Sequence, residues 1–394
     1  MKRIIRKVAV LGSGVMGSRI ACHFAGAGSD VLLLDMLTPG AESSQKPAER
    51  NRLVNDALKA AVQSNPSPVF TKETVQRIHT GNFTDNLQEA GQCDWIIEVV
   101  VERLDIKQAL YEKIEQIRKP GTLITSNTSG IPIHLLAQGR SEDFKKHFCG
   151  THFFNPPRYL RLLEIIPTPD TDPAVVDFLL NYGDVYLGKT TVLCKDTPAF
   201  IANRVGVFSI LSIFHLMDSL GLGIDEIDAL TGPIIGRPKS ATFRTADVVG
   251  IDTLVKVARG VAENCPQDEA KDIFRIPAWL DTMVEKKWLG DKTGQGFFKK
   301  TGSGKTKEIL TLNLQTLEYG PRTKPRFASI DAAKPVEDLS KRIQLLNAAT
   351  DKAGDFYRKF HYGLFSYISF RIPEISDEVY RLDDAMKAGF GWET

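Results

Sequence analysis

Two residues suited to acid–base chemistry lie close together in the segment THFFNPPRYLRLLEIIP, residues 151–167. They are His152 and Glu164, and their neighbours are mostly apolar or aromatic. A carboxylate beside an imidazole fixes its tautomer and stabilises its protonated form, which suits a general base that removes a hydroxyl proton near neutral pH. The Asn-Pro-Pro break at 155–157 would let the chain fold back and bring both side chains together. From the spacing alone, a structural histidine and a surface glutamate remain an open alternative, because most histidines are not catalytic.

A glycine-rich run, GSGVMG, follows the apolar stretch KVAVL directly and opens a helical pattern. This G-x-G-x-x-G arrangement is typical of a dinucleotide site, in which the helix N-terminus faces the pyrophosphate. Asp35 ends the next apolar run, where a carboxylate accepts hydrogen bonds from the adenosine ribose and repels a 2′-phosphate. The pattern therefore predicts NAD rather than NADP, and the alternative is a glycine turn of another α/β protein. The residues of the run are Gly12, Ser13, Gly14, Val15, Met16 and Gly17.

Two polar loops follow later apolar runs. Glu98, Glu102 and Lys107 come at or after WIIEVV, and SNTSGIP (126–132) follows TLIT. Loops at the carboxyl ends of central parallel strands border the ligand crevice of such sheets. For the first loop, the alternative is the solvated start of a helix. For the second loop, it is a cluster of helix N-cap residues. The spacing leaves both alternatives open.

The elements that must position these residues alternate between strand and helix patterns. The helical patterns include 15–27 and 104–118. Alternation of this kind predicts a doubly wound, Rossmann-type α/β domain. Segment 37–80 is polar and Pro-bounded, and we expect a helical insertion there. The predicted buried parallel strands are 7–12, 30–35, 95–100 and 122–127.

The character of the chain changes near residue 197, where a long apolar helical pattern begins. We expect an α/β N-terminal domain followed by all-α C-terminal domains. The stretch 301–335 is polar, with scattered Gly and Pro, and is interpreted as a linker. The expected boundaries are 1–195 for the NAD-binding domain, 196–300 for the helical domain, 301–335 for the linker and 336–394 for a partial second helical repeat.

The second repeat is suggested by DEIDALTGPIIG (225–236), which is echoed by YRLDDAMKAGFGWET (380–394). The first copy runs on through a further helical pattern, whereas the second stops at Thr394. We therefore expect the chain to be a fragment cut inside a second helical repeat.

Composition limits the class of protein. The 394 residues are 42% hydrophobic and 25% charged, with a formal charge of +2, which describes a globular protein without a general affinity for nucleic acid or membranes. No stretch approaches the ~18 uncharged apolar residues of a membrane span. The five cysteines are widely spaced and the N-terminus has no secretory pattern, so we expect reduced thiols and a cytoplasmic location.

The chain as a whole resembles the short-chain L-3-hydroxyacyl-CoA dehydrogenase family. The resemblance covers residues 5–300. It rests on six separated motifs in the family's order: VAVLGSGVMGSRIA, IIEVVVERLDIK, SNTSG, GTHFFNPPRYLRLLEII, CKDTPAFIANRV and DKTGQGFF. It implies NAD-dependent oxidation of an L-3-hydroxyacyl-CoA to the 3-ketoacyl-CoA in fatty-acid β-oxidation, without a metal.

The resemblance also implies roles for single residues. His152 corresponds to the catalytic base and Glu164 to its paired carboxylate. Ser129 corresponds to the serine between substrate and nicotinamide, and Asn203 to the asparagine that the helical domain adds to the site. Positions that correspond to cofactor contacts are Asp35, Glu102, Lys107, Ser129, Asn155 and Lys292.

The partial second repeat resembles the tandem C-terminal domains of bacterial multifunctional β-oxidation proteins, so an enoyl-CoA hydratase is expected beyond Thr394. Family members often dimerise through the helical domain, but tandem-repeat forms can make that contact internally, and both states stay open here.

The chain departs from the family's pattern in two places. The inserted hairpin lacks clear counterparts of the serine and lysine that touch CoA, although Arg52 and Lys59 are cations there. Lys239, Ser240 and Ala241 replace part of a usual Gly-Pro-Phe-Glu run. Two alternatives therefore remain: a related dehydrogenase of a hydroxy acid without CoA, and an inactive NAD-binding scaffold.

Overall fold

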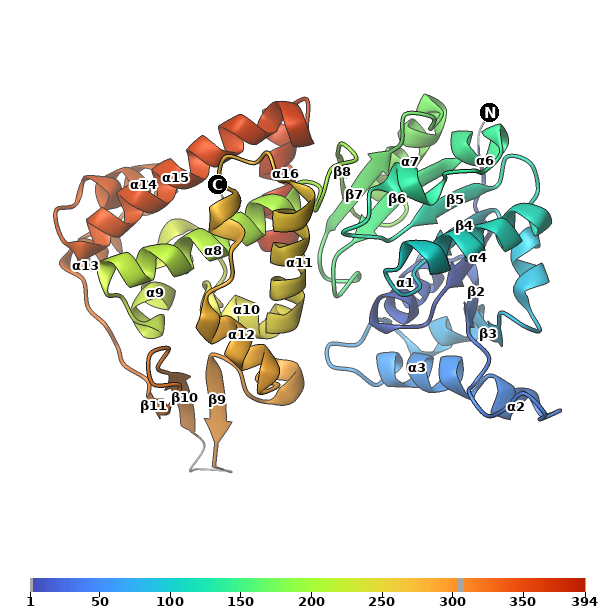
Figure 1. The fold of residues 1–394 in the computed structure, drawn as a ribbon, viewed down its shortest axis with the longest axis horizontal. Coiled ribbons are helices and arrows are strands. Elements are labelled where there is room, and N and C mark those ends of the chain that lie inside the picture. Colours follow the sequence, from blue (N-terminus) through green and yellow to red (C-terminus); the bar gives the residue numbers. More distant parts are fainter. Residues whose placement is uncertain (1–2, 303–307, 394) are drawn as a thin grey trace. The chain divides into compact units, whose positions relative to one another are not determined.

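The computed structural model describes residues 3–302 and 308–393 (Figure 1). The chain divides into two compact units, which we call unit 1 (Met1–Phe200) and unit 2 (Ile201–Thr394).

Unit 1 is built on an eight-stranded sheet with the order β3-β2-β1-β4-β5-β6-β7-β8. All neighbours pair in parallel except β6 and β7, which are antiparallel. The predicted doubly wound α/β class is confirmed, and the four predicted strands correspond to β1, β2, β4 and β5. The strands are β1 Lys7–Leu11, β2 Asp30–Asp35, β3 Ile78–Asn82, β4 Trp95–Glu98, β5 Leu123–Ser126, β6 Phe148–Phe153, β7 Leu162–Pro167 and β8 Thr190–Leu193.

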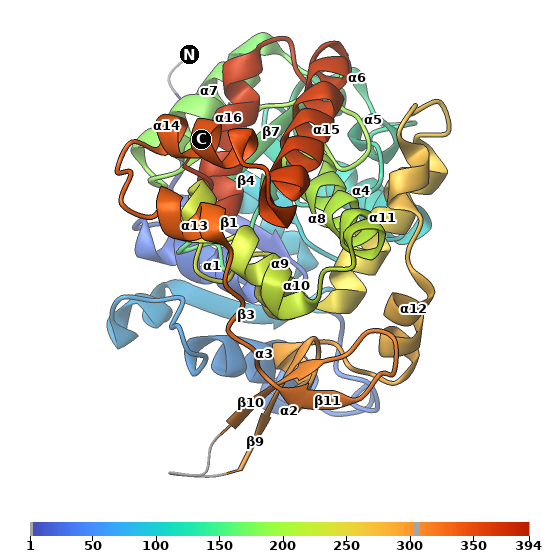
Figure 2. The same cartoon turned by 90° about the vertical axis from the view of Figure 1, so that its left-hand side faces the viewer.

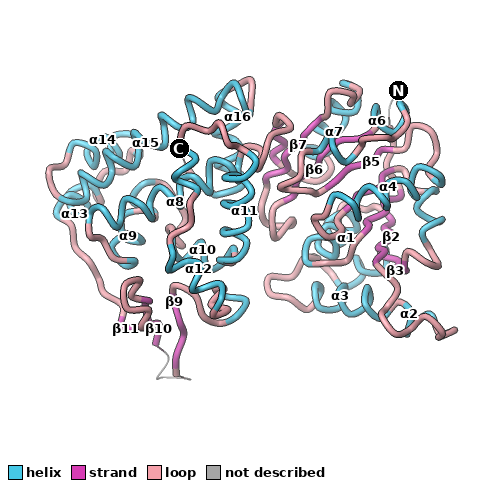
Figure 3. Tube along the Cα trace, viewed as in Figure 1, coloured by secondary structure: helices cyan, strands magenta, loops and turns pink. Residues whose placement is uncertain are grey.

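Helices lie around the strands, which run through the middle of unit 1 (Figure 3). Ile20 of α1, Val54 of α3 and Leu179 of α7 belong to one core cluster with Val10 and Trp95 of the sheet. Aromatic side chains of α4 and β6 pack together on the other face. The helices are α1 Val15–Gly26, α2 Pro47–Arg50, α3 Arg52–Val62, α4 Leu104–Ile117, α5 Ile133–Leu136, α6 Glu142–Lys146 and α7 Pro173–Val185.

Strand β3 corrects one expectation. Residues 78–80 were expected inside a helical insertion, but they begin a strand that pairs with β2 from Val31↔Ile78 to Asp35↔Asn82. The stretch IHTGN has one large apolar residue and gives no strand periodicity. Its position is fixed instead by the backbone ladder and by the buried Asn82, whose amide donates to Asn51 at 2.6 Å.

Unit 2 is mainly helical and is organised around α8, which is buried along most of its length. Gly206 of α8 leaves room for the ring of Phe390, and Phe208 stacks on Tyr367 of α15 with ring centroids 3.7 Å apart. The helices are α8 Ala202–Leu220, α9 Ile224–Leu230, α10 Phe243–Val249, α11 Ile251–Asn264, α12 Ala278–Glu285, α13 Ala328–Ala333, α14 Leu339–Ala348, α15 Lys352–Ile375 and α16 Val379–Phe390.

A small antiparallel sheet corrects the expected linker at 301–335. Strands β9 (Phe298–Thr301), β10 (Glu308–Leu312) and β11 (Tyr319–Pro321) pair in the order β11-β10-β9. Within unit 2 they lie at the end away from α14 and α16 (Figures 1 and 2). Most of their residues are exposed or half-buried, so their composition resembles that of a loop, but Leu312 is buried and anchors the sheet.

In the described parts of the chain, no helix has the length and hydropathy that crossing a membrane requires.

Candidate active site

The predicted acid–base pair forms through strand register. Strands β6 and β7 are antiparallel, and His152 lies directly opposite Glu164, so both side chains point to the same face of the sheet. The imidazole Nδ1 is 2.7 Å from Glu164 Oε2. Glu164 is fully buried and His152 is 6% exposed. With the carboxylate ionised, Nδ1 carries the proton and Nε2 is left to accept one.

Aromatic rings surround the imidazole of His152. The ring centroid of Phe154 is 4.6 Å away and that of Phe200 is 5.6 Å away. Apolar neighbours lower the local dielectric and so strengthen the interaction between an imidazolium and its carboxylate. The site is therefore suited to stabilise a proton taken up by His152.

The turn between β6 and β7 begins near Asn155 and is held by two buried or half-buried cations. Arg158 Nη1 donates to the carbonyls of Ser67 and Val69, each at 2.8 Å. Lys189 Nζ donates to the carbonyl of Leu160 at 2.9 Å and to that of Pro157. Burial lowers the pKa of Lys189 to about 8. Neither anchor was predicted: Arg158 lies within the motif of residues 150–166 but was given no role, and Lys189 belongs to no motif.

The glycine turn after β1 has the geometry that a dinucleotide site needs. Gly12 has φ +109°, and a Cβ there would lie 2.6 Å from the carbonyl oxygen of Val99. A Cβ on Gly17 would lie 1.8 Å from the carbonyl oxygen of Gly12, so α1 can pack this closely only with glycine. A Cβ on Gly14 would meet nothing within 4 Å, so this residue borders open space at the start of α1. The helix N-terminus is therefore accessible to a phosphate group.

Asp35 lies beside this turn. Its Oδ2 accepts hydrogen bonds from the backbone N–H of Ser13 at 2.6 Å and from the Ser13 hydroxyl at 2.5 Å. Its Oδ1 accepts from the backbone N–H of Met36 at 2.7 Å. The open space at Gly14 and the carboxylate at the end of β2 together fit a dinucleotide with a free ribose diol.

Glu102 and Ser129 are brought together from separate loops. Glu102 Oε1 accepts from the backbone N–H of Ser129 at 2.9 Å, from its hydroxyl at 3.0 Å and from the backbone N–H of Gly130 at 2.5 Å. The carboxylate thus fixes the position of the serine loop after β5.

Lys107 is buried and paired inside unit 1. Its Nζ lies 2.6 Å from Glu98 Oε1 and 3.2 Å from the carbonyl of Val100. Glu98 also accepts from the hydroxyls of Tyr111 at 3.0 Å and Ser126 at 2.6 Å. Lys107 therefore supports the loop after β4, and a direct contact with a cofactor would require this ion pair to open.

Two predicted site residues belong to unit 2. Asn203 lies in the first turn of α8, next to the fully buried Arg204. The guanidinium of Arg204 donates to Asp268 Oδ2 and to the hydroxyl of Tyr367, both at 2.6 Å. Lys292 forms an ion pair with Asp252 on the surface of the unit.

Family models match both units. Residues 7–197 match the 3-hydroxyacyl-CoA dehydrogenase NAD-binding domain, and residues 200–300 match the C-terminal domain of the same family.

Similar proteins agree with these matches. A Bacillus subtilis protein named "Probable 3-hydroxyacyl-CoA dehydrogenase" is 45% identical over the whole chain, which covers 50% of that protein. A Rickettsia felis protein that carries the name of a fatty acid oxidation complex trifunctional enzyme is 32% identical, again over the whole chain and 52% of the relative. The chain thus spans about half the length of these relatives. The crystal structure of FadB2 from M. tuberculosis aligns with 75% of the chain and 99% of its own, at 27% identity and a TM-score of 0.62. The chain belongs to the 3-hydroxyacyl-CoA dehydrogenase family.

Proposed function

We propose that the chain catalyses the NAD-dependent oxidation of an L-3-hydroxyacyl-CoA to the 3-ketoacyl-CoA in fatty-acid β-oxidation. The observation that carries this proposal is the buried His152–Glu164 pair, 2.7 Å apart, in the same unit as a glycine turn that fits a dinucleotide. Family membership supplies the substrate class.

In this mechanism His152 Nε2 accepts the proton of the substrate's 3-hydroxyl group. Glu164 holds the imidazole by Nδ1 and stabilises the imidazolium that forms. Bound NAD supplies the hydride acceptor for C3. In the reverse direction, protonated His152 returns its proton to the carbonyl oxygen of the 3-keto group.

Four other residues position the reactants in this proposal. Ser129, fixed by Glu102, and Asn203, at the start of α8, hold the reacting oxygen. Asn155 and Lys292 contact the cofactor. The hydrogen bonds between Ser129 and Glu102 support the role of Ser129, because a catalytic group must be held to within a fraction of an ångström. The correspondence with the family's motifs supports the other three roles.

The activity can be tested by reducing acetoacetyl-CoA with NADH and measuring the loss of NADH absorbance. Free acetoacetate under the same conditions is the comparison, and faster turnover of the free acid would replace the CoA substrate with a hydroxy acid. No turnover of either compound at any pH would instead assign the chain a scaffold role.

We also propose that the full-length protein joins this dehydrogenase to an enoyl-CoA hydratase. Whole-chain similarity to a relative named as a trifunctional enzyme, of which the chain covers about half, supports the fusion. Hydration of an enoyl-CoA by the full-length protein would test it, and the mass of the protein in solution would decide between monomer and homodimer.

A further inference from the structure

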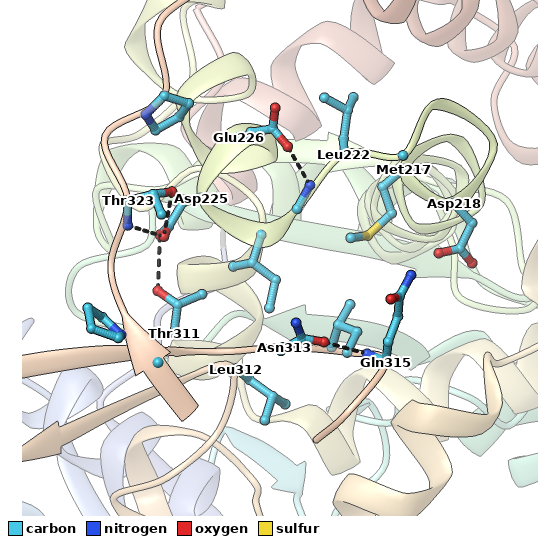
Figure 4. Close-up of a pocket in the computed structure, with 17 residues that line it drawn as sticks. Met217, Asp218, Leu222, Asp225, Glu226, Thr311, Leu312, Asn313, Gln315 and Thr323 are labelled. Atoms are coloured by element: carbon cyan, nitrogen blue, oxygen red, sulfur yellow. Dashed lines mark hydrogen bonds between the residues drawn. The ribbon is translucent and has the colours of Figure 1, made fainter. Parts of the chain in front are cut away.

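Two cavities of unit 2 differ in the partners that their charged side chains have within the described protein. The first, about 690 Å³, lies between α9 and the small sheet (Figure 4). Its buried carboxylate, Asp225, accepts from Thr311 at 3.1 Å, from the backbone of Thr323 at 2.7 Å and from Arg322 at 3.1 Å. This carboxylate has its partners within the protein and calls for no ligand.

The second cavity, about 570 Å³, lies among α14, α15, α16 and the loop after α9. We call it the Arg237 cavity. Its walls are mostly apolar, and its volume falls in the usual range of small-molecule sites. The apolar lining includes Ile343, Leu364, Phe365, Ile368, Leu382 and Met386.

The polar group of special interest in this cavity is the guanidinium of Arg237. It donates to the hydroxyl of Ser209 at 3.2 Å, and it lies over the rings of Phe360 and Trp392, 4.8 and 3.9 Å from their centroids. Within residues 3–302 and 308–393, no carboxylate lies within ion-pair distance of it. Burial lowers the pKa of Arg237 to about 9. Arg237 is half-buried, and ring contacts offset only part of the cost of removing its cation from water.

The other titratable groups of the lining do not supply a counter-charge inside the cavity. His361 has its Nδ1 2.8 Å from Asn347 Oδ1, and burial, with the nearby Arg237, lowers its pKa to about 4, so it is neutral at pH 7. Asp383 also lines the cavity, but it is exposed to solvent, which screens its charge.

We propose that the Arg237 cavity binds the carboxylate of an unesterified fatty acid, with the acyl chain along the apolar walls. A planar guanidinium matches a carboxylate with two parallel hydrogen bonds, and a single cation balances one negative charge. A CoA thioester carries several phosphate charges and no free carboxylate at its acyl end, so it is a poor match for this lining. The site lies wholly within unit 2 and is separate from the His152 pair.

Calorimetric titration of the full chain with dodecanoate tests the proposal. We expect saturable binding, with at least tenfold weaker binding of methyl dodecanoate, which has the same chain without the charge. Arg237→Met should weaken dodecanoate binding about 10- to 100-fold, the usual effect of losing a buried charge-assisted hydrogen bond. Lys239→Met, which removes an exposed cation two residues away, should leave binding unchanged. Equal affinity for acid and ester, or unchanged binding by Arg237→Met, would overturn the proposal.

Two further measurements keep the test decisive. Ile368→Trp fills the apolar part of the cavity and leaves Arg237 in place, so it should abolish binding even if Arg237→Met fails to fold. Saturating acetoacetyl-CoA should not displace dodecanoate. Displacement would place the fatty acid in the active site and contradict a separate cavity, whatever the outcome for the dehydrogenase activity.

Discussion

Glu98 and Glu164 are both fully buried at the sheet of unit 1, on strands β4 and β7, yet their partners differ. Glu98 is bound by the ammonium of Lys107 and by the hydroxyls of Tyr111 and Ser126. Glu164 is bound by the imidazole of His152. One carboxylate is paired with an ammonium group, and the other with an imidazole, the side chain that most often acts as a general acid or base.

Under the proposed mechanism, one sheet would use the same residue type for stability at Glu98 and for chemistry at Glu164. Burial makes the charge of either carboxylate costly, so each must keep its partner. The ammonium group of Lys107 compensates the negative charge of Glu98. In the proposed mechanism, the histidine partner compensates the charge of Glu164 when it takes the proton of the substrate's hydroxyl group.

The largest effect should come from His152→Ala. We expect kcat for acetoacetyl-CoA reduction to fall by about 10² to 10⁴, the usual range for losing a general acid–base. His79→Ala, an exposed histidine on β3, is the matched control and should keep normal turnover. Near-normal kcat in His152→Ala would remove His152 from the mechanism.

Lys107→Met should have the largest effect on stability. It leaves Glu98 buried without its cation, which typically costs about 3–5 kcal/mol in the free energy of unfolding. The double variant Lys107→Met, Glu98→Gln removes both charges and should recover part of this loss. Urea unfolding measures both, and a single-variant cost below about 1 kcal/mol would show that Glu98 does not need the lysine.

A smaller effect is expected from Glu164→Gln. The amide keeps the shape of the side chain but no longer stabilises an imidazolium, so kcat should fall on the order of 10²-fold. Steady-state kinetics should show the loss mainly in kcat, with KM for acetoacetyl-CoA little changed. A pure KM effect would mean that Glu164 only shapes the pocket.

The smallest expected effect is on the pH dependence of stability, and it comes from Lys189, which is buried like Lys107 but has no carboxylate among its hydrogen-bond partners described above. Lys189 donates to backbone carbonyls, and burial lowers its pKa to about 8 in the folded chain from the usual 10.5. Between pH 8 and pH 10.5, Lys189 binds more protons in the unfolded chain than in the folded chain. The free energy of unfolding of the wild type therefore increases as the pH rises through this range. Relative to Lys189→Met, the wild type should gain on the order of 1–2 kcal/mol in urea unfolding between pH 7.5 and 9.5. A constant difference between the two proteins across this range would contradict the shifted pKa.

Much of unit 1 could be predicted because its signals are local. Strands β1, β2, β4 and β5 are apolar runs, and the glycine turn has a fixed spacing. The pairing of His152 with Glu164 was also predictable, since a turn at 155–157 places two strand-like stretches side by side. Strand β3 and the sheet of β9, β10 and β11 could not be predicted. Few of their residues are apolar, and hydrogen bonds of the backbone ladder hold them in place.

The remaining contacts of the sites depend on tertiary structure. Arg158 and Lys189 anchor the turn after β6 through contacts with backbone carbonyls that no sequence spacing indicates. Arg237 becomes notable only through the cavity around it and the ring of Trp392. Spacing along the sequence contains no information about such distant partners.

The buried contacts between α8 and the last helices limit how this protein can be shortened. Both family models end by residue 300, yet Arg204 of α8 is bound by Tyr367 and also pairs with Glu374 at 3.1 Å. Phe208 and Gly206 pack against α15 and α16. A chain trimmed at residue 300 would expose these surfaces and strip an interior arginine of part of its compensation. In this chain the final helices therefore complete the packing around α8, and removing them should lower the free energy of unfolding of unit 2.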